Sequence, residues 1–197
     1  WILKDAVLPK ALPRYSDKLQ QLKNQIELHK QNKSKKEHVE VLQKQYYLTR
    51  KKYINAYDNM LAVSRNNIVD LSHIENINII SETIHFWENK KLKNIAYSIM
   101  PNHVHRVLEL YQKDDNGNPV YLQDIMLSVK RYSARQINIR ETRSGNLWQN
   151  ESFETTIRDE KHLYHAVEYT LNNPVSVWLI KNRDDWPGNF LCEDWVW

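Results

Sequence analysis

Two strand-like runs joined by a very short turn constrain this sequence more than any other feature. Residues 92–100 and 103–111 each have strand character, and Pro101-Asn102 between them is a typical turn pair, so they predict an antiparallel pair. The second run begins His103-Val104-His105. Side chains two apart on a strand point to the same face, with Cα atoms about 7 Å apart. Two imidazoles so placed can hold one metal ion, although His-X-His also occurs by chance among ordinary surface or core histidines.

The composition is that of a soluble globular protein with a sizeable core. The 197 residues are 41% hydrophobic and 26% charged, with no apolar run long enough to cross a bilayer and no signal-peptide pattern, so no membrane partner is expected. The chain begins at Trp1, which leaves room for preceding residues. The single cysteine, Cys192, excludes an intramolecular disulfide and fits a reducing cytoplasm. Three glycines, none in a phosphate-cradling loop, argue against nucleotide-binding folds, and the net charge of +4 leans towards a polyanionic partner.

The hydrophobic spacing predicts helices over 16–29, 39–60, 73–87, 122–139 and 160–172, with short strands at 1–3 and 152–157. Ser72 is the expected cap of the third helix, whose buried stripe should include Ile74 and Ile84, and Pro174 should stop the fifth. The segment after the fifth helix is expected to be irregular. This order of elements predicts an α+β fold, an antiparallel sheet with helices packed on it.

We expect one domain over 1–197, in which 14–67 is a basic helical insertion. Its second helix carries Lys44, Arg50, Lys51 and Lys52. These cations form either a solvated helical face or an arm that contacts phosphates. A dimerisation element is a third interpretation of the insertion.

The fifth predicted helix carries two polar side chains on one face. Tyr169 and Asn173 are four residues apart and therefore lie together beside the predicted core stripe. They project one hydroxyl and one amide from the same side. The structural alternative is that Tyr169 packs at the margin of the core and Asn173 caps the helix.

Five motifs in a fixed order closely resemble the single-tyrosine HUH transposases, in particular the REP-associated tyrosine transposases. They are Met-Pro-Asn-His-Val-His at 100–105, Lys-Arg-Tyr-Ser-Ala-Arg-Gln-Ile-Asn at 130–138, Gly-Asn-Leu-Trp-Gln at 145–149, Ile-Arg-Asp at 157–159, and Tyr169 followed by Asn-Pro-Val at 173–175. The resemblance covers about 77–186, and a weaker similarity extends to the start of the chain. It implies the ferredoxin-like sheet of the HUH fold.

The resemblance also implies a chemistry. His103 and His105 match the metal-binding pair, Asn173 matches the third ligand, and the ion would be Mg²⁺ or Mn²⁺. Tyr169 matches the nucleophile, which attacks DNA to give a 5′-phosphotyrosine and a free 3′-OH. A phenol normally titrates near pH 10, so a base or the field of the metal must assist it.

The implied partner is single-stranded or hairpin DNA, including palindromic repeats, and family members that act as dimers make a homodimer a further expectation. Lys130, Arg131, Arg135 and Arg158 would bind DNA, and the alternative for the first three is a solvated helical face. Trp148 would either stack on a base or pack in the core. Arg106 departs from the aliphatic family pattern and would reach a sheet edge or a DNA phosphate.

The sequence therefore predicts a metal-dependent DNA strand transferase. A related alternative is a domesticated nuclease that processes chromosomal repeats. An alternative of a different class is a DNA-binding protein that has lost catalysis, against which the intact His103, His105, Tyr169 and Asn173 argue.

Overall fold

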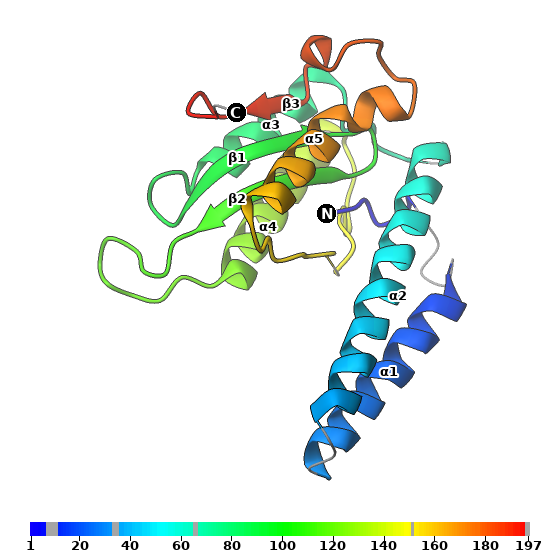
Figure 1. Ribbon diagram of the computed structural model, residues 1–197. Coiled ribbons are helices and arrows are strands. Elements are labelled where there is room, and N and C mark those ends of the chain that lie inside the picture. The colour runs from blue at the N-terminus through cyan, green and yellow to red at the C-terminus, as the bar shows by residue number, and fades with distance from the viewer. Residues whose placement is uncertain (7–11, 33–35, 65–66, 151, 196–197) are drawn as a thin grey trace. The chain divides into compact units, whose positions relative to one another are not determined.

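The computed structural model describes residues 1–6, 12–32, 36–64, 67–150 and 152–195 (Figure 1). The chain divides into two compact units. One comprises Val7–Arg65, and the other comprises Trp1–Ala6 together with Asn66–Trp197. No helix among the described residues is both long enough and apolar enough to cross a bilayer.

The smaller unit is a pair of helices, α1 (Pro13–Gln31) and α2 (Lys36–Val63), as the spacing predicted. The two helices pack against each other, and the rings of Tyr15 and Tyr53 lie 6.0 Å apart between them. The side chains of Lys44, Lys51 and Lys52 are exposed. This exposure suits a solvated face and a phosphate-binding arm equally, so the role of this unit stays a prediction.

The larger unit contains a three-stranded antiparallel sheet in the order β2-β1-β3. Its strands are β1 (Leu92–Ile99), β2 (Val104–Leu110) and β3 (Asn189–Leu191). The tight pairing of β1 with β2 is confirmed, with Ile99 opposite Val104 and Ser98 opposite His105. The N-terminal segment also pairs next to the sheet. Ile2 forms an isolated β-bridge with His103, and Leu3 forms one with Trp148.

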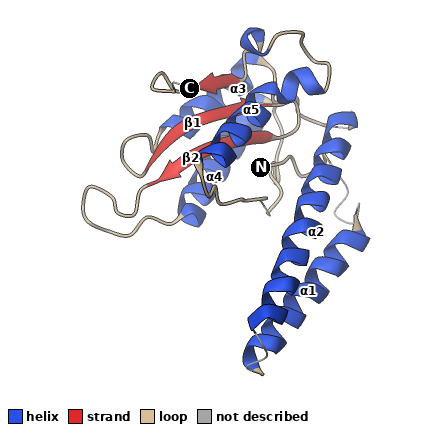
Figure 2. Cartoon of the chain, viewed as in Figure 1, coloured by secondary structure: helices blue, strands red, loops and turns tan. Residues whose placement is uncertain are grey.

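Helices cover both faces of this sheet (Figure 2). They are α3 (Ile74–His85), α4 (Leu122–Arg140) and α5 (Glu160–Ser176), with a short 3₁₀ helix, η1, at Arg183–Asp185. On one face α5 buries Val167 and Leu171 against Ala96 and Val107 of the strands. On the other face α3 packs on β1, and α4 packs on α3. The predicted α+β architecture is therefore confirmed.

Several local predictions were wrong. Residues 152–157 form no strand, although Ile157 does pack against the core under α5. The segment after α5 is more regular than expected, because it contains η1 and pairs with β1 as β3. Helix α5 does not stop before Pro174 but continues to Ser176. A proline removes only one helix hydrogen bond, and Pro174 itself is buried, so packing outweighs that loss.

The start of α3 also differs from the prediction. His73 rather than Ser72 is its N-cap, and the Ser72 hydroxyl donates to Asp70 instead. Ile74 is exposed, whereas Ile84 is fully buried as expected. Ile74 is the first residue of the helix and lies outside the buried stripe.

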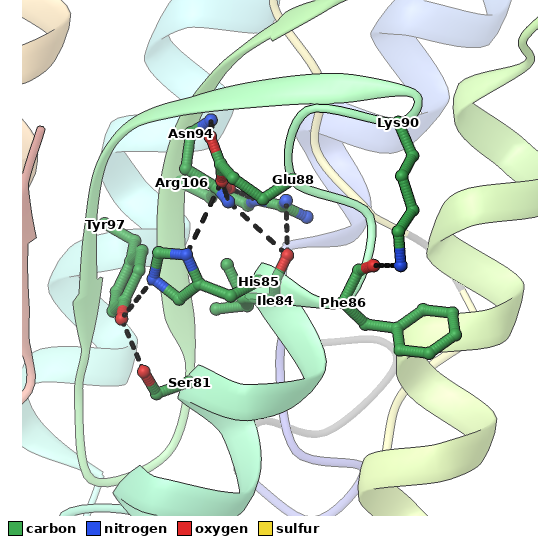
Figure 3. A network of polar contacts seen from close by, with 9 residues as sticks. All are labelled: Ser81, Ile84, His85, Phe86, Glu88, Lys90, Asn94, Tyr97 and Arg106. Atoms are coloured by element: carbon green, nitrogen blue, oxygen red, sulfur yellow. Dashed lines mark hydrogen bonds and ion pairs between the residues drawn. The ribbon is translucent and has the colours of Figure 1, made fainter. Parts of the chain in front are cut away.

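Arg106 lies on the edge strand β2, but its guanidinium is bonded within the fold and does not reach out to DNA. Its side chain points to the α3 side of the sheet, where the guanidinium Nε donates to Asn94 Oδ1 at 2.8 Å and Nη2 donates to the Ile84 carbonyl at 3.2 Å (Figure 3). Asn94 in turn donates from its backbone and side chain to the Glu88 carboxylate. Burial lowers the pKa of the Arg106 guanidinium to about 10, so it remains charged at neutral pH and Glu88 balances it.

The same network continues through His85 and Tyr97. His85 Nδ1 lies 3.5 Å from the Glu88 carboxylate, and its Nε2 lies 3.3 Å from the Tyr97 hydroxyl. The Tyr97 hydroxyl also lies 2.7 Å from Ser81 Oγ, which ties α3 to the strand (Figure 3). The network joins α3, β1 and β2 through polar groups rather than through apolar contact.

Replacing Arg106 by Met should destabilise the fold. The substitution removes the positive charge beside Glu88 and leaves the Asn94 oxygen without its donor, which should cost about 2–4 kcal/mol of unfolding free energy. Urea denaturation of the variant measures this loss. Arg131→Met, on the exposed side of α4, serves as the matched control and should change stability by less than about 0.5 kcal/mol. Equal stability of the two variants would contradict the proposed role of the network.

Candidate active site

His103 and His105 both point to the α5 side of β2, as the two-residue period predicted. Val107, two residues after His105, lies on the same face and packs in the core under α5. Arg106, between His105 and Val107, faces α3. The backbone around His103 is held on its outer side by the N-terminal segment. Leu3 N–H donates to the Asn102 carbonyl at 2.9 Å, and Val104 N–H donates to the Trp1 carbonyl at 2.7 Å. The backbone on either side of the first histidine is therefore held by two hydrogen bonds to the N-terminal segment.

The two imidazoles direct nitrogens at each other. His103 Nε2 lies 2.8 Å from His105 Nε2, and the rings meet edge to face with centroids 4.6 Å apart. The other nitrogen of His103, Nδ1, lies 2.7 Å from Asn102 Oδ1. An amide oxygen only accepts hydrogen bonds, so Nδ1 carries the proton and Nε2 presents a lone pair. Asn102 is thus an orienting residue that the sequence identified only as part of a turn.

Helix α5 brings the predicted tyrosine and asparagine to this pair. The Asn173 carboxamide nitrogen lies 3.2 Å from His105 Nε2, and the Tyr169 ring lies 5.4 Å from the His105 ring at an angle of 83°. Asn173 is buried, whereas Tyr169 remains 48% exposed. The prediction that this strand and this helix pack side by side is confirmed. A half-exposed phenol next to a buried polar pair can be reached from solvent.

Burial keeps both histidines neutral. Desolvation lowers the pKa of His103 well below its usual value, and the neighbouring His105 lowers it further. Burial likewise lowers the pKa of His105 to about 3. Neutral imidazoles are the form that binds metal ions, whereas imidazolium does not.

The donor set fits a single divalent cation. Neighbouring ligands of an octahedral ion are about 3 Å apart when each lies 2.0–2.1 Å from the metal, close to the 2.8 Å between the two histidine nitrogens. Rotation of the Asn173 carboxamide would turn its oxygen towards the same point. All three donors are neutral, and no cluster of three or more His, Cys, Asp or Glu side chains suited to a metal occurs in the described part of the chain. Such a set would hold Mg²⁺ or Mn²⁺ weakly on its own.

The predicted DNA-binding residues lie apart from this group. Arg131 and Arg135 are exposed on α4, which packs behind the sheet on α3 rather than beside α5. The Lys130 ammonium is half-buried and donates to the carbonyls of Gln149 and Asn150, at 3.0 and 3.2 Å. Arg158 is exposed just before α5. Their role in binding DNA stays a prediction, and Arg131 and Arg135 are better exposed than Lys130.

Trp148 belongs to the core. Its side chain is buried, and its indole N–H donates to Ser133 Oγ at 3.0 Å. The edge of its ring also meets Trp1, with centroids 6.0 Å apart. Trp148 therefore anchors the N-terminal segment that flanks His103 and is not available to stack on a base.

Comparison with known proteins identifies relatives over about half of the chain. A Haemophilus influenzae protein provisionally named a REP-associated tyrosine transposase is 30% identical over 111 residues, which span 54% of this chain and 63% of that protein. The REP-associated tyrosine transposase of Escherichia coli K12 is 27% identical over 99 residues, 50% of this chain and 54% of that one. The chain thus spans less than two thirds of the length of either relative. No family model matches the sequence.

A solved structure shares the fold. It is the structure of a REP-associated tyrosine transposase bound to a REP hairpin, with a TM-score of 0.51, 22% sequence identity, and coverage of 64% of this chain and 70% of that one. The antiparallel sheet with its covering helices therefore places the chain in the α+β class of tyrosine transposase folds. The sequence matches confirm the resemblance found in the motifs: the chain is similar to the REP-associated tyrosine transposases.

Lowering the pH from 7 to 5 should destabilise the metal-free protein. Both site histidines have a lower pKa in the folded state than the usual 6.5, so the unfolded chain binds more protons and acid favours unfolding. Their contribution is complete above about pH 6.5 and is lost progressively below it, by about 1–2 kcal/mol per histidine at pH 5. Urea denaturation in the presence of a chelator measures the loss.

A pair of glutamine variants isolates this effect from other titrating groups. His105→Gln should reduce the pH dependence, because glutamine does not titrate. His165→Gln, an exposed position four residues before Tyr169 on α5, should leave the pH dependence as it is in the wild type. The same pH dependence in both variants would show that His105 is not buried in neutral form.

Proposed function

We propose that this protein cleaves and rejoins DNA, with Tyr169 as nucleophile and a divalent cation held by His103, His105 and Asn173. The observation that carries the proposal is the convergence of these four side chains from the start of β2 and from α5, with His105 and Asn173 separated by 68 positions in sequence. The family relationship supports the same chemistry.

The reaction exchanges one phosphodiester for another. The Tyr169 oxygen attacks the scissile phosphorus, a bond forms between them, and the bond from phosphorus to the 3′ oxygen of the DNA breaks. The phenol loses its proton and the 3′ oxygen gains one. The products are a 5′-phosphotyrosine and a free 3′-OH, and attack by another 3′-OH reverses the step without ATP.

The side chains of this site have different roles. His103, fixed by Asn102, and His105 present lone pairs from a rigid strand, and Asn173 holds α5 against them. The half-exposed position of Tyr169 allows a DNA strand to approach its oxygen. A bound cation would supply Lewis-acid stabilisation of charge on the scissile phosphate.

The substrate that this proposal favours is DNA with an unpaired segment, including hairpins of palindromic repeats. The solved relative is bound to a REP hairpin. This chain has a net charge of +4 and exposes Arg131, Arg135 and Arg158, which suits a polyanion. The proposal covers both a mobile transposase and a domesticated repeat-processing enzyme, since their chemistry is the same.

A covalent adduct tests the proposal directly. Labelled hairpin DNA with a single-stranded flank, incubated with the protein and Mn²⁺, should give a protein–DNA species that survives a denaturing gel. Tyr169→Phe should lower its yield at least 100-fold, because phenylalanine has no oxygen to attack phosphorus. Tyr164→Phe is the matched control on the same helix, with a similarly exposed ring, and should form the adduct normally.

Two results would contradict the mechanism. One is an undiminished adduct in Tyr169→Phe. The other is binding of the hairpin by the wild type with no adduct across a series of flanking sequences, which would favour a DNA-binding protein without catalysis.

Metal and DNA should bind cooperatively. The protein supplies neutral donors only, so the negative charge that Mg²⁺ and Mn²⁺ prefer must come from the phosphate of the substrate. Titration of Tyr169→Phe with Mn²⁺, followed by electron paramagnetic resonance, should show at least fivefold tighter binding with hairpin DNA than without it. By linkage, Mn²⁺ should tighten DNA binding by the same factor.

The matched variant for this titration is His105→Gln in the Tyr169→Phe background, in which Mn²⁺ should bind weakly with or without DNA. Equal Mn²⁺ affinity in the presence and absence of DNA would contradict the idea that the phosphate completes the ligand set.

A further inference from the structure

The C-terminal end of α5 carries a tryptophan at a position that favours glycine. After the C-cap Val177, the N–H of Trp178 donates to the Val175 carbonyl at 3.1 Å, and the N–H of Leu179 donates to the Pro174 carbonyl at 3.0 Å. This pair of bonds defines a Schellman motif, in which the residue after the cap adopts the left-handed conformation. Trp178 does so, with φ of 61°. Left-handed backbone is unfavourable for a bulky residue, whereas glycine adopts it freely.

Burial of the side chain does not offset this strain. The Trp178 side chain is 92% exposed, so its ring contributes almost no burial to stability. The other five tryptophans in the described part of the chain are buried or partly buried. Thr142 adopts a similar left-handed conformation after α4, so what distinguishes Trp178 is a large apolar ring that is almost fully exposed, which is explained better by contact outside the chain than by folding.

Trp178 lies just beyond the end of the helix that carries Tyr169 and Asn173. It follows Asn173 by five residues, and α5 itself ends at Ser176. Exposed Lys181 follows three residues later, and its ammonium suits a neighbouring phosphate. An exposed aromatic ring with a cation close by in the chain is the combination that binds single-stranded nucleic acid.

We propose that Trp178 stacks on an unpaired base of the DNA strand engaged at Tyr169, and so positions the strand for cleavage. This inference rests on the proposed function, because it takes the ligand to be DNA. The ring would bind bases with little sequence preference, since every base has a π-face. Stacking of this kind contributes about 5- to 100-fold in affinity for each base.

Two substitutions at Trp178 separate stacking from folding. Trp178→Gly removes the ring and relieves the strain, so its thermal midpoint should equal or exceed that of the wild type. Its affinity for a labelled hairpin with a single-stranded flank, measured by fluorescence anisotropy, should fall at least fivefold. Trp178→Phe keeps a ring and should stay within about threefold of the wild type.

Phe86→Ala is the matched control. Phe86 is an exposed aromatic residue at the C-cap of α3, on the other face of the sheet, where its ring contacts Lys90. This variant should bind the hairpin as the wild type does. Replacing single bases of the flank by abasic sites then locates the contact, because one abasic position should weaken the wild type but not Trp178→Gly.

Equal hairpin affinity of Trp178→Gly and the wild type would overturn the inference, as would a change in oligomeric state in Trp178→Gly, since the ring would then contact a second copy. The outcomes are independent of the test of catalysis. A Tyr169-dependent adduct with Trp178-independent binding defeats only this inference, whereas Trp178-dependent binding without an adduct defeats only the proposed catalysis.

Discussion

Strand β2 carries polar side chains to both of its faces, although helices cover both. His103 and His105 point towards α5, and Arg106 points towards α3. Buried polar groups are costly unless they find partners, so each face must satisfy its own set. Because strand side chains alternate, a slip of one residue would move the arginine into the histidine cluster and leave both sets unpaired. The pairing of β2 with its neighbours is therefore fixed by polar chemistry as well as by apolar packing.

The two faces satisfy their polar groups in different ways. On the α3 side the positive charge of Arg106 meets the carboxylate of Glu88 through Asn94, and the network is balanced within the chain. On the α5 side the Nε2 atoms of two neutral imidazoles face each other with no opposite charge, and the Asn173 carboxamide nitrogen lies 3.2 Å from His105 Nε2. Lone pairs that face one another 2.8 Å apart favour a proton or a cation between them. The Arg106 network is satisfied within the fold, whereas the histidine pair is suited to binding a ligand.

The features that sequence alone predicted depend on local periodicity. The two-residue period placed His103 and His105 on one face, and the four-residue spacing placed Tyr169 with Asn173; their meeting then required only that the strand and the helix pack together. The features that it missed depend on distant partners. No residue near Arg106 in sequence indicates that its guanidinium will bond to Asn94, which in turn bonds to Glu88. Strand β3 has three residues, too few to show alternation, and it forms because β1 offers a free edge.

Three departures from local preference lie at the histidine pair and along the C-terminal part of α5. His103 is a buried histidine held neutral, Asn173 is an amide on a buried helical face, and Trp178 is an exposed ring on strained backbone. Each of these choices costs stability, and an apolar residue or a glycine would serve the fold better. Elsewhere on α5 the pattern is ordinary, with Val167 and Leu171 buried and an aspartate cap at Asp159. Conflict between local preference and the observed residue is expected where a surface serves a ligand rather than the fold. The catalytic proposal and the stacking proposal thus rest on the same kind of observation, a residue whose environment conflicts with its local preference.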